Sequence, residues 1–384
     1  MSIAIDPRFS SPLPINRLVS LDVLRGITIA FMILVNNGKA YPYPALEHSV
    51  WNGWTPTDLV FPTFLFLVGI TIVFSFESRL SKGSSKSSLL FHTFRRALIL
   101  FLLGLVVNGF PYFPLGTLRI YGVLQRIALC FLISSILYLL DRRPASKVVI
   151  VVIALLGYWI LMRWVPVPGY GLPGRDIPLF DPTRNWAAYL DRHIFPGRLY
   201  NGVRDPEGLL STVPAVGTTL LGMLTGMWLR SKRNPALKAW GMLVAGVLGI
   251  SLGLLWGHWF PINKNIWTSS FVLFTAGCSL VALAICYWAV DIKNWKNGWT
   301  YVWLVFGTNA ITAYVFSELF ATTLSKIPMH IGAAKVSLST YVFLKCFAGI
   351  PSPHLASLGY SISFVVACFI PNFFLYRKKI FLKV

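Results

Sequence analysis

Long apolar runs recur along this chain, and they limit its fold more strictly than any other feature of the sequence. An α-helix needs roughly 17 to 25 mostly apolar residues to cross a hydrocarbon layer about 30 Å thick. Because 55% of the 384 residues are hydrophobic and only 12% are charged, the chain cannot hide its apolar surface in one soluble core. The sequence therefore predicts an all-α polytopic membrane protein.

About ten transmembrane helices are expected, each bounded by polar, basic or Gly/Pro-rich segments. Their ranges are 19–38, 58–77, 95–112, 120–140, 147–165, 208–229, 239–259, 268–290, 299–321 and 354–376. Nine to eleven spans stay compatible with the sequence. Asn108 and Pro111 interrupt the third run, and 334–350 fits a re-entrant or amphipathic helix.

Basic residues cluster on one side of this ten-span arrangement. They lie in 78–96 (Arg79, Lys82, Lys86, Arg95, Arg96), 141–147, 230–238, 291–298 and the C-terminal tail. The net charge of +21 therefore reflects membrane topology and not nucleic-acid binding. The positive-inside rule places these segments and both termini in the cytoplasm. The outer loops are then 39–57, 166–207, 260–267 and 322–353.

The chain is expected to form one domain. Residues 1–18 form a cytoplasmic tail, 19–376 the membrane bundle and 377–384 a basic cytoplasmic tail. No cleavable signal peptide is expected, because residues 1–19 mix charges with three prolines and lack a short apolar core. The cysteines lack metal-ligand spacing and are predicted to be buried small hydrophobes, with neither disulfide nor metal: Cys130, Cys278, Cys286, Cys346 and Cys368.

The polar loop after the first span is the strongest candidate for chemistry. It carries His48 among prolines and aromatic residues, shortly before Asp58 begins the second span. An imidazole is a usable proton acceptor at neutral pH, and Asp58 or Glu47 could orient one ring nitrogen while the other faces a substrate. A structural or solvent-exposed histidine is the alternative. Asn36, at the end of the first span, is either a further polar site residue or an ordinary helix end.

Other polar residues interrupt apolar surroundings, where an ionisable group costs a few kcal/mol. Arg25 either pairs with Asp22 at the entry of the first span or receives a phosphate from the cytoplasmic side. Arg126, with Gln125 beside it, is expected to face the bundle interior, with a structural ion pair as the alternative. Two further groups have simpler alternatives, as helix caps for Asp205 with Glu207 and as a turn for Asn263, Lys264 and Asn265.

Several motifs, in order along the chain, resemble the heparan-α-glucosaminide N-acetyltransferase family. They are RLVSLDVLRGITIAFMILVNN, HSVWNGWTPTDLVFP, YGVLQRIA, RDPEGLL, FPINKNIW, GTNAITAYVFSE and YRKKIF. The resemblance extends from about residue 17 to the end, and the second and fifth motifs together are its most specific part. It implies acetyl transfer across a membrane, from acetyl-CoA on the cytoplasmic side to a glucosamine amine on the outer side.

The resemblance also implies roles for individual residues. The family's active-site histidine falls on His48 and its active-site asparagine on Asn36. His48 would be the general base or an acetyl carrier, Asn36 would donate to the thioester carbonyl and Asp58 would hold the imidazole tautomer.

The remaining expected contacts divide between acetyl-CoA and the acceptor sugar. For acetyl-CoA the candidates are Arg25, Arg126, Gln125 and the basic cytoplasmic loops. The sugar contacts are expected from Glu47, Trp51, Asn52, Asp205, Glu207, Asn263, Lys264, Asn265, Asn309 and Glu318. No metal is expected.

A chain that starts directly at the bundle is typical of a compact bacterial relative, which predicts the bacterial inner membrane as its location. Its partners would be the lipid bilayer and an amino-sugar acceptor. The resemblance also allows a homodimer, although the sequence identifies no interface. An amino-sugar or muropeptide transporter is the alternative function. Such a protein needs internal repeats or broken helices, and the sequence contains no convincing repeat.

Overall fold

The computed structural model describes residues 18–296 and 298–381, so most of the expected N-terminal tail lies outside it. The longer helices are α1 (Val19–Asn36), α2 (Val60–Leu80), α3 (Lys86–Gly109), α4 (Val123–Leu140), α5 (Pro144–Trp164), α7 (Thr212–Arg230), α8 (Pro235–Trp256), α9 (Ser269–Cys286), α10 (Gly298–Thr308), α11 (Ala310–Lys326) and α13 (Pro353–Arg377). The short elements are η2 (Pro44–Leu46), η3 (Pro56–Leu59), α6 (Trp186–Ile194), η4 (Tyr287–Ile292), β1 (Pro328–Ile331), β2 (Ala334–Ser337) and α12 (Leu338–Cys346).

Nine helices among the described residues are long and apolar enough to cross a membrane, and the bent pair α10 and α11 makes a tenth if counted as one span. The predicted all-α, multi-pass fold is confirmed. Exposed faces of α3, α5, α8 and α13 carry leucine, valine, isoleucine and phenylalanine side chains. Such faces suit a hydrocarbon environment, since lipid tails are as apolar as these residues.

The third span begins earlier than the sequence predicts. Helix α3 starts at Lys86, nine residues before the expected position 95, because the Ser85 hydroxyl caps it by accepting a hydrogen bond from the Ser88 amide at 3.2 Å. Lys86, expected in the basic segment before the span, therefore belongs to the helix.

The ninth expected span is broken. Helices α10 and α11 meet at Asn309 with a bend of 75°. Asn309 leaves the helical region, at φ −123° and ψ 39°, and its side-chain amide donates to the Ile380 carbonyl at 3.1 Å. The chain after α13 thus contacts the break between the two half-helices.

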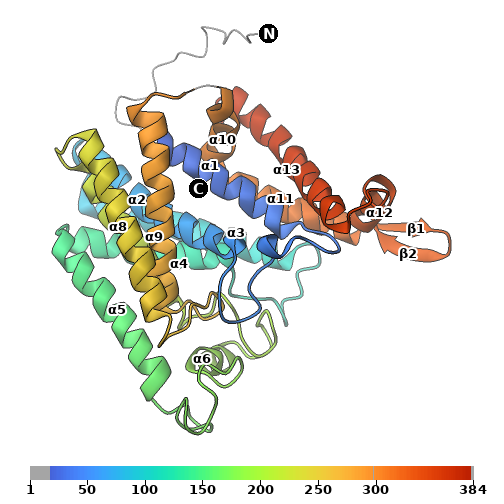
Figure 1. The fold of residues 1–384 in the computed structure, drawn as a ribbon, viewed down its shortest axis with the longest axis horizontal. Coiled ribbons are helices and arrows are strands. Elements are labelled where there is room, and N and C mark those ends of the chain that lie inside the picture. Colours follow the sequence, from blue (N-terminus) through green and yellow to red (C-terminus); the bar gives the residue numbers. More distant parts are fainter. Residues whose placement is uncertain (1–17, 297, 382–384) are drawn as a thin grey trace.

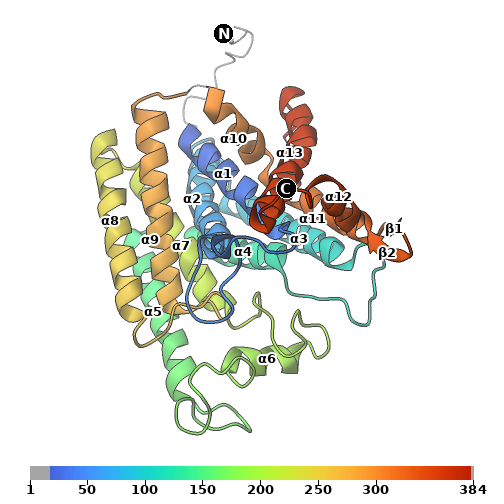
Figure 2. The same ribbon diagram turned by 45° about the vertical axis from the view of Figure 1, so that its right-hand side comes forward.

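The connecting segments gather at opposite ends of the bundle. One end, called the His48 end here, holds residues 37–59, the 165–211 segment with α6, and the 257–268 turn (Figure 1 and Figure 2, bottom). The N-termini of α1 and α10 lie at the other end (top). The 322–353 segment, expected as an outer loop, forms the antiparallel β1–β2 hairpin and α12. Cys346 on α12 is exposed, so its predicted burial is wrong.

Glycines let α1 and α10 approach closely. A Cβ on Gly26 would lie 1.8 Å from the backbone carbonyl oxygen of Trp303, and one on Gly307 would lie 1.9 Å from the backbone carbonyl oxygen of Asp22. Close backbone packing of this kind is typical of membrane helices. The hydrophobic effect does not drive such helices together in lipid, so they associate through van der Waals packing, which small residues permit. It places the Arg25 side chain directly against the end of α10.

Candidate functional site

His48 and Asp58 form the centre of the His48 end. The Nδ1 atom of His48 lies 2.7 Å from Oδ1 of Asp58. The His48 side chain is 50% exposed, whereas that of Asp58 is 1% exposed. An ionised carboxylate only accepts hydrogen bonds, so the pair assigns the proton to Nδ1 and leaves the lone pair of the ring on Nε2.

Local sequence explains why Asp58 is so firmly held. Pro56 and Asp58 open the 3-10 helix η3, and Thr55 and Asp58 form a capping box at its start. The Oδ2 atom of Asp58 accepts from the backbone amides of Ser49 and Thr55, both at 3.1 Å. One oxygen thus fixes the carboxylate to the loop backbone, and the other is left for the histidine.

Lys264 approaches the same pair from a distant part of the chain. Its Nζ atom lies 3.0 Å from Nδ1 and 3.3 Å from Nε2 of His48, and 3.6 Å from Oδ1 of Asp58. Burial lowers the pKa of Lys264 from its ordinary value, and the carboxylates of Asp58 and Glu207 oppose that shift. The sequence had placed Lys264 among the sugar contacts, whereas the structure places it on the imidazole.

The two loops that carry these residues are tied together. Asn263 donates to the Asn52 side-chain oxygen at 3.1 Å, and the Gly53 amide donates to the Ile262 carbonyl at 2.8 Å. Asn263 is fully buried, whereas Asn265 and exposed Glu47 lie at the outer parts of the same loops. Of the expected sugar contacts, Asn52 and Asn263 therefore hold the loops in register.

Trp51 joins the loop that carries His48 to the long 165–211 segment. Its indole donates to the Phe180 carbonyl at 3.0 Å, and the Arg204 guanidinium lies 4.3 Å from the centroid of its ring. A stacked arginine of this kind stabilises an aromatic face that is partly open to solvent. Trp51, which was expected to contact the sugar, thus also has a packing role.

Asn36 belongs to a second polar pair. Its side-chain nitrogen donates to Oε1 of Glu318 on α11 at 3.1 Å. The structure therefore joins a residue expected in catalysis to one expected to contact the sugar, across 282 positions of sequence. Helix α1, which ends at Asn36, also contacts η3, which carries Asp58.

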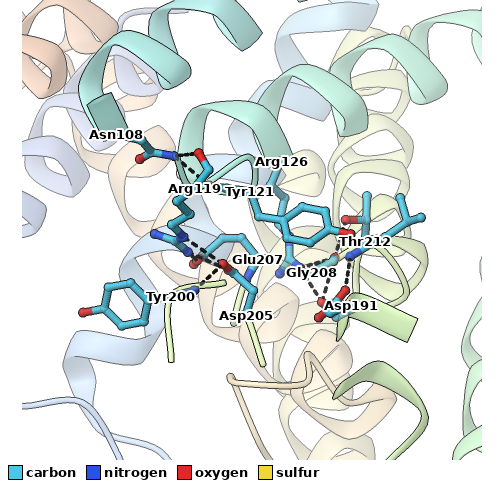
Figure 3. A network of polar contacts seen from close by, with 12 residues as sticks. Asn108, Arg119, Tyr121, Arg126, Asp191, Tyr200, Asp205, Glu207, Gly208 and Thr212 are labelled. Carbon is cyan, nitrogen blue, oxygen red and sulfur yellow. Dashed lines mark hydrogen bonds and ion pairs between the residues drawn. The ribbon is translucent and has the colours of Figure 1, made fainter. Parts of the chain in front are cut away.

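The acidic residues Asp205 and Glu207 are held by an arginine that sequence reasoning missed. Arg119 binds Asp205 through two nitrogens, at 2.8 and 2.6 Å, and Glu207 at 2.6 Å (Figure 3). The Tyr200 ring lies against the same guanidinium, 4.6 Å away. A basic residue just before the fourth span, facing the acidic RDPE segment in the ten-span topology, was the available signal.

Arg126 and Gln125 lie apart from Arg25, although all three were expected to bind acetyl-CoA. Arg126 donates to the Gly208 carbonyl at 2.9 Å and to the Ser211 hydroxyl, and its guanidinium lies 5.0 Å from the Trp267 ring centroid (Figure 3). These partners belong to the His48 end. The reason is that α4 begins at Val123, soon after Arg119, which binds Asp205 of the 165–211 segment at the His48 end.

Arg25 lies in a cavity of about 810 Å³ at the other end of the bundle. Its guanidinium donates to Asp22 at 3.0 Å, to the Gly307 carbonyl at 3.2 Å and to the Thr71 hydroxyl at 3.2 Å. The charged and titratable side chains lining the cavity are Asp22, Arg25, Arg79, Lys82, His92, Arg95, Arg96 and Arg230. Asn309, expected at the sugar, lines this cavity instead.

The cavity has the size and charge of a site for a large anion. Ligand pockets typically measure 300 to 1,000 Å³, and here six arginine or lysine side chains face a single aspartate. Arg96 lies against the Phe131 ring, with 4.9 Å between the guanidinium carbon and the centroid. A phosphorylated molecule with an apolar portion fits this combination of cations and aromatic surface.

Known proteins resemble this chain over most of its length. A family model described as "Heparan-alpha-glucosaminide N-acetyltransferase, catalytic" matches residues 17–253. The human protein named heparan-alpha-glucosaminide N-acetyltransferase is 30% identical over a match that covers 79% of this chain and 53% of the human protein. The mouse protein of that name is 31% identical, with coverages of 79% and 54%. The chain thus spans about half the length of the curated relatives it matches.

Proposed function

Because this chain belongs to the heparan-alpha-glucosaminide N-acetyltransferase family, we propose that it is a membrane-bound acetyltransferase. It would move an acetyl group from acetyl-CoA to the amine of a glucosamine-type sugar. The observation that carries this proposal is the separation of two sites. A histidine paired with a buried aspartate lies at one end of the bundle, and a cation-lined cavity lies at the other.

His48 would act as the general base of this reaction. Nδ1 faces Asp58, so Nε2 is available to take a proton from the attacking amine. Attack forms the C–N bond and moves the carbonyl electrons to oxygen, and collapse of the intermediate breaks the C–S bond. The departing CoA thiolate then takes the proton from Nε2. The same nitrogen could instead carry the acetyl group between two half-reactions.

The cation-lined cavity would hold the CoA phosphates. Coenzyme A carries a diphosphate and a 3'-phosphate, and arginine recognises such groups with paired hydrogen bonds. Arg25 reaches the cavity from α1, and Arg79, Arg96 and Arg230 reach it from three further helices. By the positive-inside rule this end faces the cytoplasm. Both termini would then be cytoplasmic, in a bacterial inner membrane, with residues 19–376 as one bundle.

Acetyl transfer from radiolabelled acetyl-CoA to glucosamine, by the full chain in liposomes, tests the proposal. We expect transfer by the wild type and a loss of at least about 10²-fold in His48→Ala, with CoA binding unchanged. His330→Ala, which alters an exposed histidine on β1, is the matched control. A wild type that acetylates no amino sugar, or a His48→Ala variant with full activity, contradicts the enzyme function.

The broken span favours one alternative, an amino-sugar or muropeptide transporter. Transporters bind substrates at discontinuous helices, and α10 and α11 bend by 75° at Asn309 beside the cavity. Uptake of labelled amino sugar into liposomes that lack acetyl-CoA separates the two functions. Uptake without acetylation supports the transporter. The homodimer stays a prediction, which the mass of the detergent-solubilised protein tests by light scattering.

A further inference from the structure

The ammonium group of Lys264 lies on the imidazole that the proposed reaction uses. Its Nζ atom is 3.0 Å from Nδ1 and 3.3 Å from Nε2 of His48. A nitrogen almost equally distant from both ring nitrogens does not lie along the axis of the Nε2 lone pair. The Nε2 lone pair therefore stays available for a substrate proton while a positive charge lies beside it.

Hydrogen bonds of Lys264 and of its neighbour Asn263 fix the position of Lys264 in its loop. Asn263 is fully buried and bonds Asn52, and the Trp267 amide donates to the Lys264 carbonyl at 3.1 Å. The Lys264 side chain is 17% exposed, against 50% for His48. A charge held this firmly costs little reorganisation when a new charge develops next to it.

The charged groups around Lys264 come from several elements. Asp58 on η3 lies 3.6 Å away, Glu207 lies on the segment before α7, and Arg126 lies on α4. The two carboxylates favour the ammonium form, whereas burial and Arg126 disfavour it. Asp58 is already bonded to two backbone amides and His48, and Glu207 to Arg119. Both carboxylates near the ammonium group thus already make hydrogen bonds to other groups.

Asn36, the expected donor to the thioester oxygen, uses one of its two side-chain N–H groups to bond Glu318 at 3.1 Å. A carbonyl carbon within reach of an amine that transfers its proton to Nε2 must lie next to the imidazole, the group beside which Nζ of Lys264 lies. Of the two groups, Lys264 has the full charge that best stabilises an oxyanion.

We propose that Lys264 is a catalytic residue of the proposed transfer, and that its ammonium group stabilises the oxyanion formed on the acetyl carbonyl. As the amine attacks, its proton moves to Nε2 of His48 and the carbonyl electrons move to the oxygen beside Nζ. The C–S bond then breaks, the electrons return to the carbonyl, and the CoA thiolate takes the proton from Nε2. This inference rests on the proposed function for its substrates but not for its geometry.

An activated ester tests the inference without either natural substrate. Attack of Nε2 on p-nitrophenyl acetate forms acetyl-imidazole and releases p-nitrophenolate, and water then removes the acetyl group. We expect release that depends on His48 and falls about 10²-fold in Lys264→Met, while Lys335→Met, on exposed β2, releases at the wild-type rate. Equal release by wild type and Lys264→Met, or no His48-dependent release at all, overturns the inference.

Acetyl transfer from acetyl-CoA to glucosamine gives the second readout. In Lys264→Met we expect kcat to fall about 10²-fold with both KM values within about threefold. Because burial lowers the pKa of Lys264, wild-type kcat should decline on the alkaline side, and Lys264→Arg, which stays charged, should extend activity to higher pH. A loss confined to KM overturns the catalytic role. Esterolysis that needs Lys264, in a wild type that acetylates no sugar, refutes the proposed function alone.

Discussion

The Nδ1 atom of His48 and the Oδ1 atom of Asp58 lie 2.7 Å apart, although one side chain is half exposed and the other is buried. This contact fixes which ring nitrogen carries the proton. The same carboxylate also links the reacting imidazole to the backbone amides of Ser49 and Thr55. Geometry and charge at His48 therefore both depend on Asp58.

Asp58→Asn is expected to reduce kcat by about 10² to 10⁴-fold. The amide keeps an acceptor for the loop amides but loses the charge that holds the Nδ1 tautomer. Steady-state acetyl transfer measures the effect, with thermal unfolding as a check on folding. Asp176→Asn, which alters an exposed aspartate of the 165–211 segment, is the control. Activity of Asp58→Asn within threefold of wild type contradicts the tautomer role.

Asn36 and Glu318 are expected to act as a unit, since their side chains are bonded at 3.1 Å. Asn36→Ala and Glu318→Gln should each lower kcat, and the double variant should lose little more than the worse single variant. Pairing Asn36→Ala with Glu77→Gln, whose carboxylate instead bonds Tyr138, should give additive losses. Additivity in the first pair shows that the bond has no functional coupling.

Arg96 and Arg230 are expected to bind CoA through its phosphates. Arg96→Gln and Arg230→Gln should each weaken CoA binding by roughly 10 to 100-fold, the size of a charge-assisted hydrogen bond. Calorimetry of the protein in nanodiscs measures the dissociation constant. Lys232→Gln, on an exposed turn, should leave it unchanged.

Pantetheine, which lacks the nucleotide phosphates, supplies the ligand control for these variants. Its affinity should be the same in wild type, Arg96→Gln and Arg230→Gln, because no phosphate is lost. CoA affinity, in contrast, should decline with added salt. If the two substitutions weaken pantetheine as much as CoA, the cavity does not recognise phosphate.

Arg119 is expected to stabilise the fold, because its loss leaves the fully buried carboxylate of Asp205 and the nearly buried one of Glu207 without their cation. Arg119→Gln should lower the free energy of unfolding by about 3 to 5 kcal/mol, and Arg119→Lys should restore only part of it. Denaturant titration in micelles measures this. Arg175→Gln, which removes an exposed pair with Asp176, should cost no more than about 1 kcal/mol.

Asp191 on α6 is expected to make stability depend on pH. Burial raises the pKa of Asp191 to about 6, above its unfolded value. A raised carboxyl pKa contributes stability that is complete below the unfolded pKa near 4 and is lost as pH rises through about 6. Between pH 4 and pH 8, the free energy of unfolding of Asp191→Asn should therefore rise relative to that of the wild type by on the order of 1 to 3 kcal/mol. Parallel stability curves for the two proteins contradict this.

The sequence by itself determined the fold class and the local geometry of His48. Apolar runs of membrane-spanning length are a property of consecutive residues, so the expected spans and the described helices agree apart from the start of α3 and the break at Asn309. His48 and Asp58 also lie in one short loop whose prolines and capping box fix the backbone. These features depend on neighbours in the chain, and neighbours can be read from it.

The tertiary structure alone decided which distant side chains meet. Lys264 reaches His48 across 216 positions, and Arg119 reaches Asp205 across 86. Arg126 lies at the His48 end and Asn309 in the Arg25 cavity, each opposite to its expected place. Hydropathy cannot assign such contacts, because they depend on how closely helices pack, as at Gly26, and on which end of the bundle each helix starts from.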